Sequence, residues 1–195
     1  NKYKILGVDP ATNVVLRSIR KKIPALPLFF DNSVAKKISN EWGKAQLIYG
    51  NNCIAHLNNL KDLMSGVQNL LTNDGVFVVE CNYWGGMVKN TNYSLIYHDH
   101  FSYFSVKPWI NFAKKYKMYP FDAIVTPAQG GSLRLFLSKK KLKRTKRFKS
   151  LLNEELKTKL NTYSKCVEYR NNVYDVSRRL RALVLNLRKK GKKIA

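Results

Sequence analysis

The stretch Asn73-Asp74-Gly75-Val76-Phe77-Val78-Val79-Glu80 decides the fold class of this chain. Asn-Asp-Gly favours a turn, and the β-branched run that follows lacks the polar alternation of a half-exposed strand. Runs of this kind are typical of strands buried on both faces, which occur in parallel sheets covered by helices. We therefore expect an α/β protein.

The segments on either side repeat the same alternation of apolar runs and helical patterns. We expect further strands at residues 3–8, 25–30, 45–49, 123–126 and 132–138, with helices at 11–22, 33–40, 60–71 and 108–117. From residue 148 to 190 the pattern is helical with a basic outer face and no proline. It predicts one long helix or a helix pair after the sheet.

Composition limits the class of protein further. The chain has 195 residues and is 45% hydrophobic, which suits one globular core. It contains no apolar run of about 18 residues, so we expect no membrane span. Its 3 cysteines are far apart without CxxC spacing, which argues against a disulfide framework or a zinc site in this segment. We expect a cytoplasmic protein.

The net charge of +24 suggests either a polyanion partner or general surface charge. The densest basic run, residues 139–149, also suits a solvated connector between two structured regions. We favour surface charge and do not expect a nucleic acid as the partner.

Polar residues follow several of the expected strands, where ligands bind in open α/β sheets. They are Asp9, Asp31 after Phe30, Asn51-Asn52 and Cys81-Asn82-Tyr83. A carboxylate in the position of Asp9 can accept both hydroxyls of a ribose. Asp9 before Pro10 is equally a helix start signal, and local sequence leaves both interpretations open.

The segment Ile96-Tyr97-His98-Asp99-His100-Phe101-Ser102-Tyr103-Phe104-Ser105 concentrates groups that hold or move protons. It includes two of the chain's 3 histidines, so it suggests acid–base chemistry. The alternative is a buried aromatic segment whose histidines bond backbone carbonyls. A His98-x-His100 metal pair has no evident third ligand, and we expect no metal here.

Glycine-rich nucleotide loops are missing from this sequence. Gly85-Gly86 and Gly130-Gly131 are isolated pairs without GxGxxG or Walker spacing. The chain begins at Asn1 without an initiator Met. We expect an internal fragment in which residues 3–8 are the second strand of the sheet, and we expect the fragment alone to be inactive.

Four motifs resemble those of S-adenosylmethionine-dependent nucleotide-sugar 3-C-methyltransferases. Leu6-Gly7-Val8-Asp9-Pro10-Ala11 resembles their second-strand motif. Asn51-Asn52-Cys53-Ile54-Ala55-His56 resembles their NNxxAH segment, residues 96–105 their YHEHxSYFS signature, and Gly130-Gly131-Ser132-Leu133-Arg134 their GGSLR hairpin. The order agrees and the similarity runs along nearly the whole chain.

The resemblance implies a class I methyltransferase sheet, here lacking its first strand, that uses S-adenosylmethionine to methylate C3 of a dTDP-4-keto-deoxysugar. It implies a methyltransferase domain over residues 1–147, a helical linker over 148–190, and the start of a Rossmann-like domain at 191–195. Zinc is expected only in a cysteine-rich N-terminal domain that this sequence does not include.

The resemblance also assigns roles to residues. His100 is the expected general base, assisted by Asp99, which replaces the family's glutamate, while Tyr97 and His56 are expected to donate to the sugar carbonyl or the diphosphate. For S-adenosylmethionine the expected residues are Asp9, Phe30 and Asn51, although Phe30 also suits a core position. For the nucleotide sugar they are Asn52, Tyr97, Gly130, Gly131 and Ser132.

Two other functions remain open at this stage. An RNA methyltransferase would share the sheet and use the positive charge, but the residues after the third expected strand, Asn51-Asn52-Cys53-Ile54, differ from an NPPY-type segment. A non-catalytic binding module would have kept the sheet and lost the cofactor. The sequence does not indicate an oligomeric state.

Overall fold

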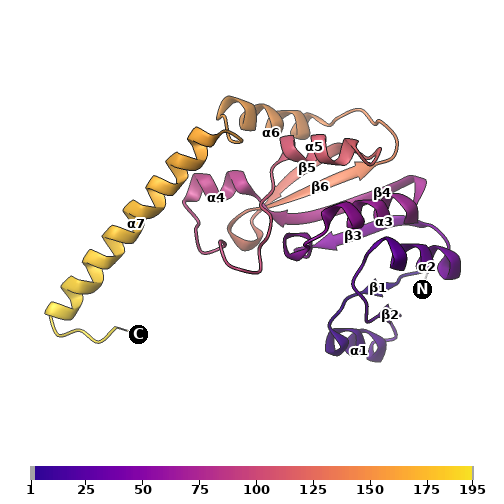
Figure 1. Cartoon of the computed structure of the whole chain (residues 1–195), viewed down its shortest axis with the longest axis horizontal. Coiled ribbons are helices and arrows are strands. Elements are labelled where there is room, and N and C mark those ends of the chain that lie inside the picture. Colours follow the sequence, from indigo (N-terminus) through magenta and orange to yellow (C-terminus); the bar gives the residue numbers. More distant parts are fainter. Residues whose placement is uncertain (1–2, 195) are drawn as a thin grey trace.

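The strands of the computed structural model, which describes residues 3–194, form two sheets (Figure 1). The smaller sheet pairs β1 (Gly7–Val8) in parallel with β2 (Ala25–Leu26). The larger has the order β3-β4-β6-β5 and consists of β3 (Ala45–Asn51), β4 (Leu71–Asn82), β5 (Tyr119–Thr126) and β6 (Ser132–Ser138). The expected α/β architecture is confirmed.

The larger sheet is mixed, because the helix-connected strands have the expected parallel arrangement and β6 alone is reversed. β3 and β4 run in parallel, whereas β6 is antiparallel to both β4 and β5. The reversal occurs at the turn between β5 and β6, where the resemblance implied a hairpin at residues 130–134.

Helices connect and cover these strands. They are α1 (Thr12–Arg20), α2 (Asn32–Trp42), α3 (Leu60–Leu70), α4 (Trp84–Asn90), α5 (Val106–Lys114), α6 (Lys146–Lys157) and α7 (Tyr163–Lys189), with short 3₁₀ turns η1 (Ile54–His56) and η2 (Ala128–Gly130). The expected helix pair at the C-terminal end is α6 and α7. Helix α4 was not predicted, because Gly85 and Gly86 lie within its first turn.

β4 is the central strand of the larger sheet and is buried on both faces. Phe77, Val79 and Cys81 belong to the main hydrophobic cluster, while Val78 and Glu80 on the other face are buried as well. The turn expected at residues 73–75 is not a separate turn: these residues lie within β4, where the pairing register with β3 shifts. Ala45 pairs with Leu71 but Leu47 pairs with Val76, so β4 contains more residues than β3 does over that interval.

The main core lies between this sheet and helices α3, α5 and α6. Its fully buried members include Met64, Trp109, Phe148 and the alternating leucines of β6, Leu133, Leu135 and Leu137. On the other face of β6, Arg134 and Phe136 are only partly buried. This alternation follows the prediction for residues 132–138.

A second, smaller cluster connects the two sheets through α2. There α3 approaches the start of α2 closely, since a side chain at Gly66 would meet the Asp31 carbonyl oxygen at 2.8 Å. The strand expected at 25–30 ends at Leu26 because Pro27 has no N–H with which to continue the ladder. Phe30 packs against both clusters, in keeping with the core position left open for it.

Helix α6 is fixed to the sheet domain by a buried carboxylate. Glu155 is 2% exposed, and its two oxygens accept the N–H groups of Val106 at 2.7 Å and Lys107 at 3.0 Å, at the start of α5. Burial raises the pKa of Glu155. Residues from 148 onward therefore contribute to the core, although they fall in the segment expected as a linker.

Helix α7 extends away from the sheets after its first turns (Figure 1). Near its start, Tyr169 packs edge-on against Trp84 of α4 and donates its hydroxyl to the Asn92 carbonyl at 3.1 Å. No helix among the described residues is long and apolar enough to cross a membrane. The C-terminal domain expected from residue 191 stays a prediction.

Replacing Glu155 by Ala should lower the free energy of unfolding by about 2–4 kcal/mol, because two buried N–H groups at the start of α5 would lose a charged acceptor. Urea denaturation followed by circular dichroism measures this change. The exposed neighbour Glu154 is the matched control, and Glu154→Ala should change stability by less than about 0.5 kcal/mol. Equal effects of the two substitutions would contradict the role given to Glu155.

Asp122 of β5 should make the stability of the protein depend on acid pH. The Arg147 guanidinium, with Thr145 and the Ala123 N–H, lowers the pKa of Asp122. A lowered folded-state pKa means that the stabilisation is complete above the unfolded value of about 3.9 and is lost as the pH falls through the folded value. Asp122→Asn should therefore destabilise the protein at pH 7, and the difference should shrink progressively in acid.

Denaturation midpoints measured from neutral to acid pH test this expectation. The control is Asp175→Asn on α7, where the carboxylate is half exposed beside Arg178 and Arg179. A difference between Asp122→Asn and the unmodified protein that stays constant over the whole pH range would rule out the proposed linkage.

Candidate functional site

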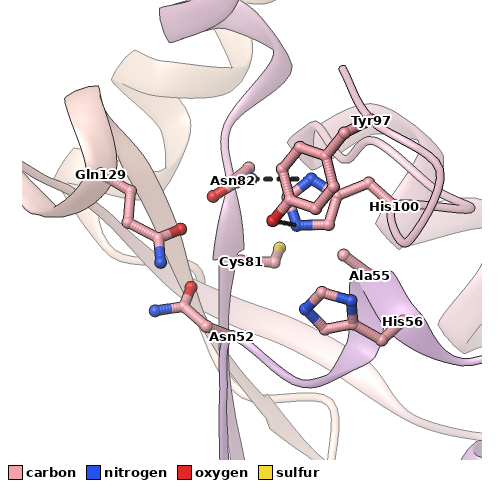
Figure 2. A pocket seen from close by; sticks show the side chains of 8 residues that line it. All are labelled: Asn52, Ala55, His56, Cys81, Asn82, Tyr97, His100 and Gln129. Carbon is pink, nitrogen blue, oxygen red and sulfur yellow. Dashed lines mark hydrogen bonds between the residues drawn. The ribbon is translucent and has the colours of Figure 1, made fainter. Parts of the chain in front are cut away.

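A pocket lies at the carboxyl ends of β3 and β4, beside the loop that carries the histidine signature (Figure 2). Its lining comes from five parts of the chain. The residues are Asn52 after β3, Ala55 and His56 in η1, Cys81 and Asn82 at the end of β4, Tyr97 and His100 in the loop, and Gln129 in η2. The sequence had brought Asn52, His56, Tyr97 and His100 into one site and had placed Cys81-Asn82 at a ligand-binding strand end without a specific role, whereas it had not indicated Gln129.

The histidine loop is tied down at several points. Phe101 N–H donates to the Ala55 carbonyl at 2.8 Å, which joins the loop to η1. Trp84 N–H donates to the Phe104 carbonyl at 2.8 Å, which joins it to α4. Within the loop His100 N–H donates to the Tyr97 carbonyl at 3.0 Å, and this turn brings the Tyr97 ring over His100 with centroids 4.0 Å apart.

The two ring nitrogens of His100 face different partners. Nδ1 lies 2.9 Å from the Leu95 carbonyl oxygen, and Nε2 lies 2.7 Å from the Tyr97 hydroxyl. A carbonyl oxygen only accepts, so Nδ1 carries the proton of the neutral ring and Nε2 has the lone pair. The Tyr97 hydroxyl then donates to Nε2. This arrangement presents a basic nitrogen and a phenol together.

His56 lies beside this pair, with its ring centroid 4.9 Å from that of His100. Its Nδ1 lies 2.9 Å from the Asp99 carbonyl oxygen, so Nδ1–H donates and Nε2 is left as an acceptor. The Asp99 carboxylate points elsewhere, because it lies 3.1 Å from His98 Nε2 in an exposed pair. The structure thus contains no direct Asp99–His100 side-chain contact, and the assisting role of Asp99 stays a prediction.

Two carboxamides in the pocket are held by strained backbone. Asn52 and Gln129 both have a left-handed conformation, with φ of 50° and 51°. The Asn52 side-chain oxygen is buried without a hydrogen-bond partner among the described residues. An unpartnered buried acceptor at a strained residue is typical of a binding site, because a ligand donor can satisfy it.

The pocket is neutral although the chain carries 36 lysines and arginines. None of its 8 lining residues is an acid, a lysine or an arginine. Glu80 of β4 pairs with Arg134 at 2.7 Å and does not line the pocket. Burial raises the pKa of the Cys81 thiol, so this group stays protonated. In the described part of the chain no group of His, Cys, Asp and Glu is arranged to hold a metal ion.

The residues expected to bind the cofactor lie at the adjoining strand ends. Asp9 follows β1, and its Oδ1 accepts the Ala11 N–H at 2.8 Å in a local turn. Helix α1 begins at Thr12 with Ala11 as its N-cap residue, so Asp9 is not the N-cap that the helix-start interpretation expected. Its Oδ2 has no hydrogen bond among the described residues, so a ribose hydroxyl can still be accepted there. Asn51 ends β3 and is exposed, whereas Phe30 lies in the core contacts described above. The cofactor roles of Asp9, Asn51 and Phe30 stay predictions.

The diglycine turn lies against the amino end of α4. Gly130 and Gly131 have φ of 77° and 127°, and the Gly131 carbonyl accepts the Tyr83 N–H at 3.1 Å. Ser132 is fully buried, with its hydroxyl donating to the Ala128 carbonyl at 3.0 Å. Of this turn, Gln129 is the residue that lines the pocket, so the substrate roles of Gly130, Gly131 and Ser132 stay predictions.

Comparison with known proteins supports an S-adenosylmethionine-dependent methyltransferase. Residues 127–195 match a family model described as the C-methyltransferase C-terminal domain. Over 133 residues the chain is 32% identical to C-methyltransferase NovU of Streptomyces niveus, an alignment that covers 68% of this chain and 32% of NovU. The chain thus spans about a third of the length of that relative.

Solved structures agree on the fold. The SAM-dependent methyltransferase from Anabaena variabilis has a TM-score of 0.51 and 12% identity, over 69% of this chain and 68% of that one. The PH0226 protein from Pyrococcus horikoshii has a TM-score of 0.50 and 11% identity, over 71% and 72%. The predicted class I methyltransferase fold is confirmed. Within that class, the sequence is similar to C-methyltransferases.

The backbone and the amide of Asn52 can be tested separately. At a φ of 50° alanine is strained and glycine is not, so Asn52→Gly should be more stable than Asn52→Ala by about 1–2 kcal/mol. Urea denaturation measures the difference. At the exposed Asn58, which lacks a positive φ, the same pair of substitutions should not show this order. A glycine variant of Asn52 no more stable than the alanine variant would contradict the left-handed conformation.

Proposed function

We propose that the protein is an S-adenosylmethionine-dependent C-methyltransferase that methylates C3 of a nucleotide-linked 4-keto-deoxysugar. The observation that carries the proposal is the His100 ring, whose Nε2 is held as an acceptor against the Tyr97 hydroxyl in a pocket at the ends of β3 and β4. The similarity to C-methyltransferases supports the class of reaction. The sugar substrate rests on the motif resemblance.

The chemistry of carbon methylation beside a ketone explains this choice of groups. A hydrogen on C3 is acidic only through the adjacent C4 carbonyl, so a base must remove it while a donor holds the enolate oxygen. The Nε2 lone pair already accepts the Tyr97 hydroxyl, so the C3 proton reaches His100 through Tyr97: the hydroxyl proton moves onto Nε2 as the Tyr97 oxygen takes the proton from C3. His56, whose ring lies beside His100, is the donor proposed for the sugar oxygen when it is protonated on Nε2.

S-adenosylmethionine supplies an electrophilic methyl group on a sulfonium, which the C3 carbanion captures. Asp9 would hold the ribose through its second carboxylate oxygen, and Asn51 lies at the end of the neighbouring parallel pair. The Asn52 amide, with its buried acceptor, would bind a sugar hydroxyl. These residues orient the two reactants and exclude water.

The neutral lining of the pocket favours a sugar over a nucleic acid at the reacting position. Phosphates are bound by Lys and Arg, and none of the 8 residues around the base is either. Hydroxyl and carbonyl groups, in contrast, suit carboxamides, imidazoles and a phenol. The chain's positive charge lies elsewhere, much of it on α6, α7 and the run between β6 and α6.

Hydrogen exchange tests the proposal without requiring methyl transfer. The full-length protein and a dTDP-4-keto-6-deoxysugar in heavy water should exchange the C3 hydrogen, measured by proton NMR. Replacing His100 by Asn should slow both exchange and methylation by about 100-fold or more, the usual contribution of a placed base. His98→Asn is the matched control, since that ring is exposed beside Asp99 and does not line the pocket.

Two results would count against the proposal. Normal exchange in the His100→Asn variant would remove His100 as the base while leaving the reaction intact. If the unmodified protein binds S-adenosylmethionine but neither exchanges the C3 hydrogen nor methylates the sugar, the sugar substrate is rejected.

A further inference from the structure

Asn82 is the last residue of β4 and is held more firmly than the other polar residues of the pocket. It is 3% exposed, and its backbone pairs with Ser132 of β6. On the other side of β4, Asn52 N–H donates to the Glu80 carbonyl at 2.8 Å. The Asn82 side chain therefore projects into the pocket from a strand bonded on both sides.

The Asn82 carboxamide faces Nδ1 of His100, whereas the Tyr97 hydroxyl bonds to Nε2 of the same ring (Figure 2). Its amide nitrogen lies 3.3 Å from His100 Nδ1, and the same Nδ1 lies 2.9 Å from the Leu95 carbonyl oxygen. The Leu95 carbonyl requires a proton on Nδ1. An Asn82 amide N–H directed at the same nitrogen would then face another N–H donor, and no hydrogen bond could form between them.

The second end of the Asn82 amide has the complementary problem. Its oxygen is buried without a hydrogen-bond partner among the described residues. A half turn about the Cβ–Cγ bond exchanges the two ends of a carboxamide without moving its other atoms. That turn brings the oxygen to Nδ1–H as a second acceptor and leaves the NH₂ group at the position where the oxygen had no partner.

We propose that Asn82 is a positioning residue for His100, whose carboxamide oxygen shares Nδ1–H with the Leu95 carbonyl. The inference rests on the proposed function in one respect, since it concerns the ring that receives a proton when C3 is deprotonated. With Nδ1–H bonded to two acceptors, the lone pair stays on Nε2. The same two acceptors stabilise the ring after it has become an imidazolium.

No acid, lysine or arginine is among the residues that line the pocket around the His100 ring, so a substitution at Asn82 can introduce a charge beside that ring. Tyr97 and Tyr103 contact it from its own loop, and His56 faces it from η1. The Cys81 thiol lines the same pocket from β4. The Asp99 carboxylate is turned towards His98.

Nitrogen NMR of the full-length protein labelled with ¹⁵N-histidine tests the inference without any substrate. Together with its exposed neighbour His98 and with His56, His100 accounts for all 3 histidines of this chain, and single substitutions assign their signals. In the unmodified protein His100 should be the Nδ1–H tautomer. The Nε2–H tautomer would overturn the proposal at this first step.

Substitution of Asn82 should then shift the pH at which His100 becomes protonated. Asn82→Asp places a carboxylate beside Nδ1–H and should raise that midpoint by about 1–3 pH units, as an opposite charge at hydrogen-bond distance does. Asn82→Leu removes the acceptor and should lower it. The midpoint of His98 should stay unchanged in both variants.

The matched control is Asn73→Asp, which adds the same charge at the exposed opposite end of β4. If Asn82→Asp and Asn82→Leu shift the His100 midpoint no more than this control does, Asn82 does not act through His100. A loss of substrate affinity in Asn82→Leu with the midpoint unmoved would assign Asn82 to ligand binding and would also reject the positioning role.

The exchange assay separates this inference from the proposed function. In the Asn82→Asp variant the acid limb of the C3 exchange rate should move in the same direction as the His100 midpoint. If the tautomer and the midpoint shifts are as predicted but no variant exchanges the C3 hydrogen, the sugar reaction is rejected and the positioning role of Asn82 is supported. If the C3 hydrogen exchanges but His100 is the Nε2–H tautomer, the sugar reaction is supported and the positioning role of Asn82 is rejected.

Discussion

The pairing of β4 on both sides is the constraint on which the site depends. β3 runs parallel to it and β6 antiparallel, so its carboxyl end is fixed between Asn52 and Ser132. One face of the strand belongs to the main core, and the Glu80–Arg134 pair covers the end of the other. Since the strand cannot slip without exchanging its faces, Asn82 has one position relative to the histidine loop.

The loop completes the site from the opposite side and depends on backbone hydrogen bonds. Phe101 bonds to η1, Trp84 bonds to Phe104, and the Leu95 carbonyl faces the His100 ring. These contacts select one ring nitrogen of His100 as the base. A histidine in a solvated loop would lack contacts that fix its tautomer. The pocket also lacks the positive charge that dominates the chain's surface, so the reacting group meets neutral donors and acceptors.

Much of the fold could be predicted from the sequence, because hydrophobic periodicity reports burial directly. Residues 132–138 form a strand with the expected alternation, and the helical pattern after residue 148 is a helix pair. The reversed direction of β6 follows the hairpin implied by the motif at residues 130–134, since the hydrophobic pattern alone does not report strand direction. Helix α4 was missed because packing of Met87, which is 1% exposed, outweighs the low helix propensity of two glycines.

The site was predicted in part for a similar reason. Proton-bearing residues close in sequence, such as Tyr97 and His100, are recognisable as a motif, and His56 and Asn52 came from a second one. Asn82 was expected at a ligand-binding strand end, but its contact with His100 and the entry of Gln129 into the pocket depend on segments that only the folded chain brings together. The choice of Nε2 as the base depends on the Leu95 carbonyl, and no side-chain pattern in the sequence reports a backbone contact.

The most direct measurement is a crystal structure of the full-length protein with S-adenosylhomocysteine and a nucleotide-linked 4-keto-deoxysugar. The account predicts that C3 of the sugar lies within about 3.5 Å of His100 Nε2 or of the Tyr97 oxygen bonded to it, with Nδ1 still turned to Leu95. A sugar whose C3 lies beyond the reach of both atoms, or a ring turned so that Nε2 faces the Leu95 carbonyl, would contradict it.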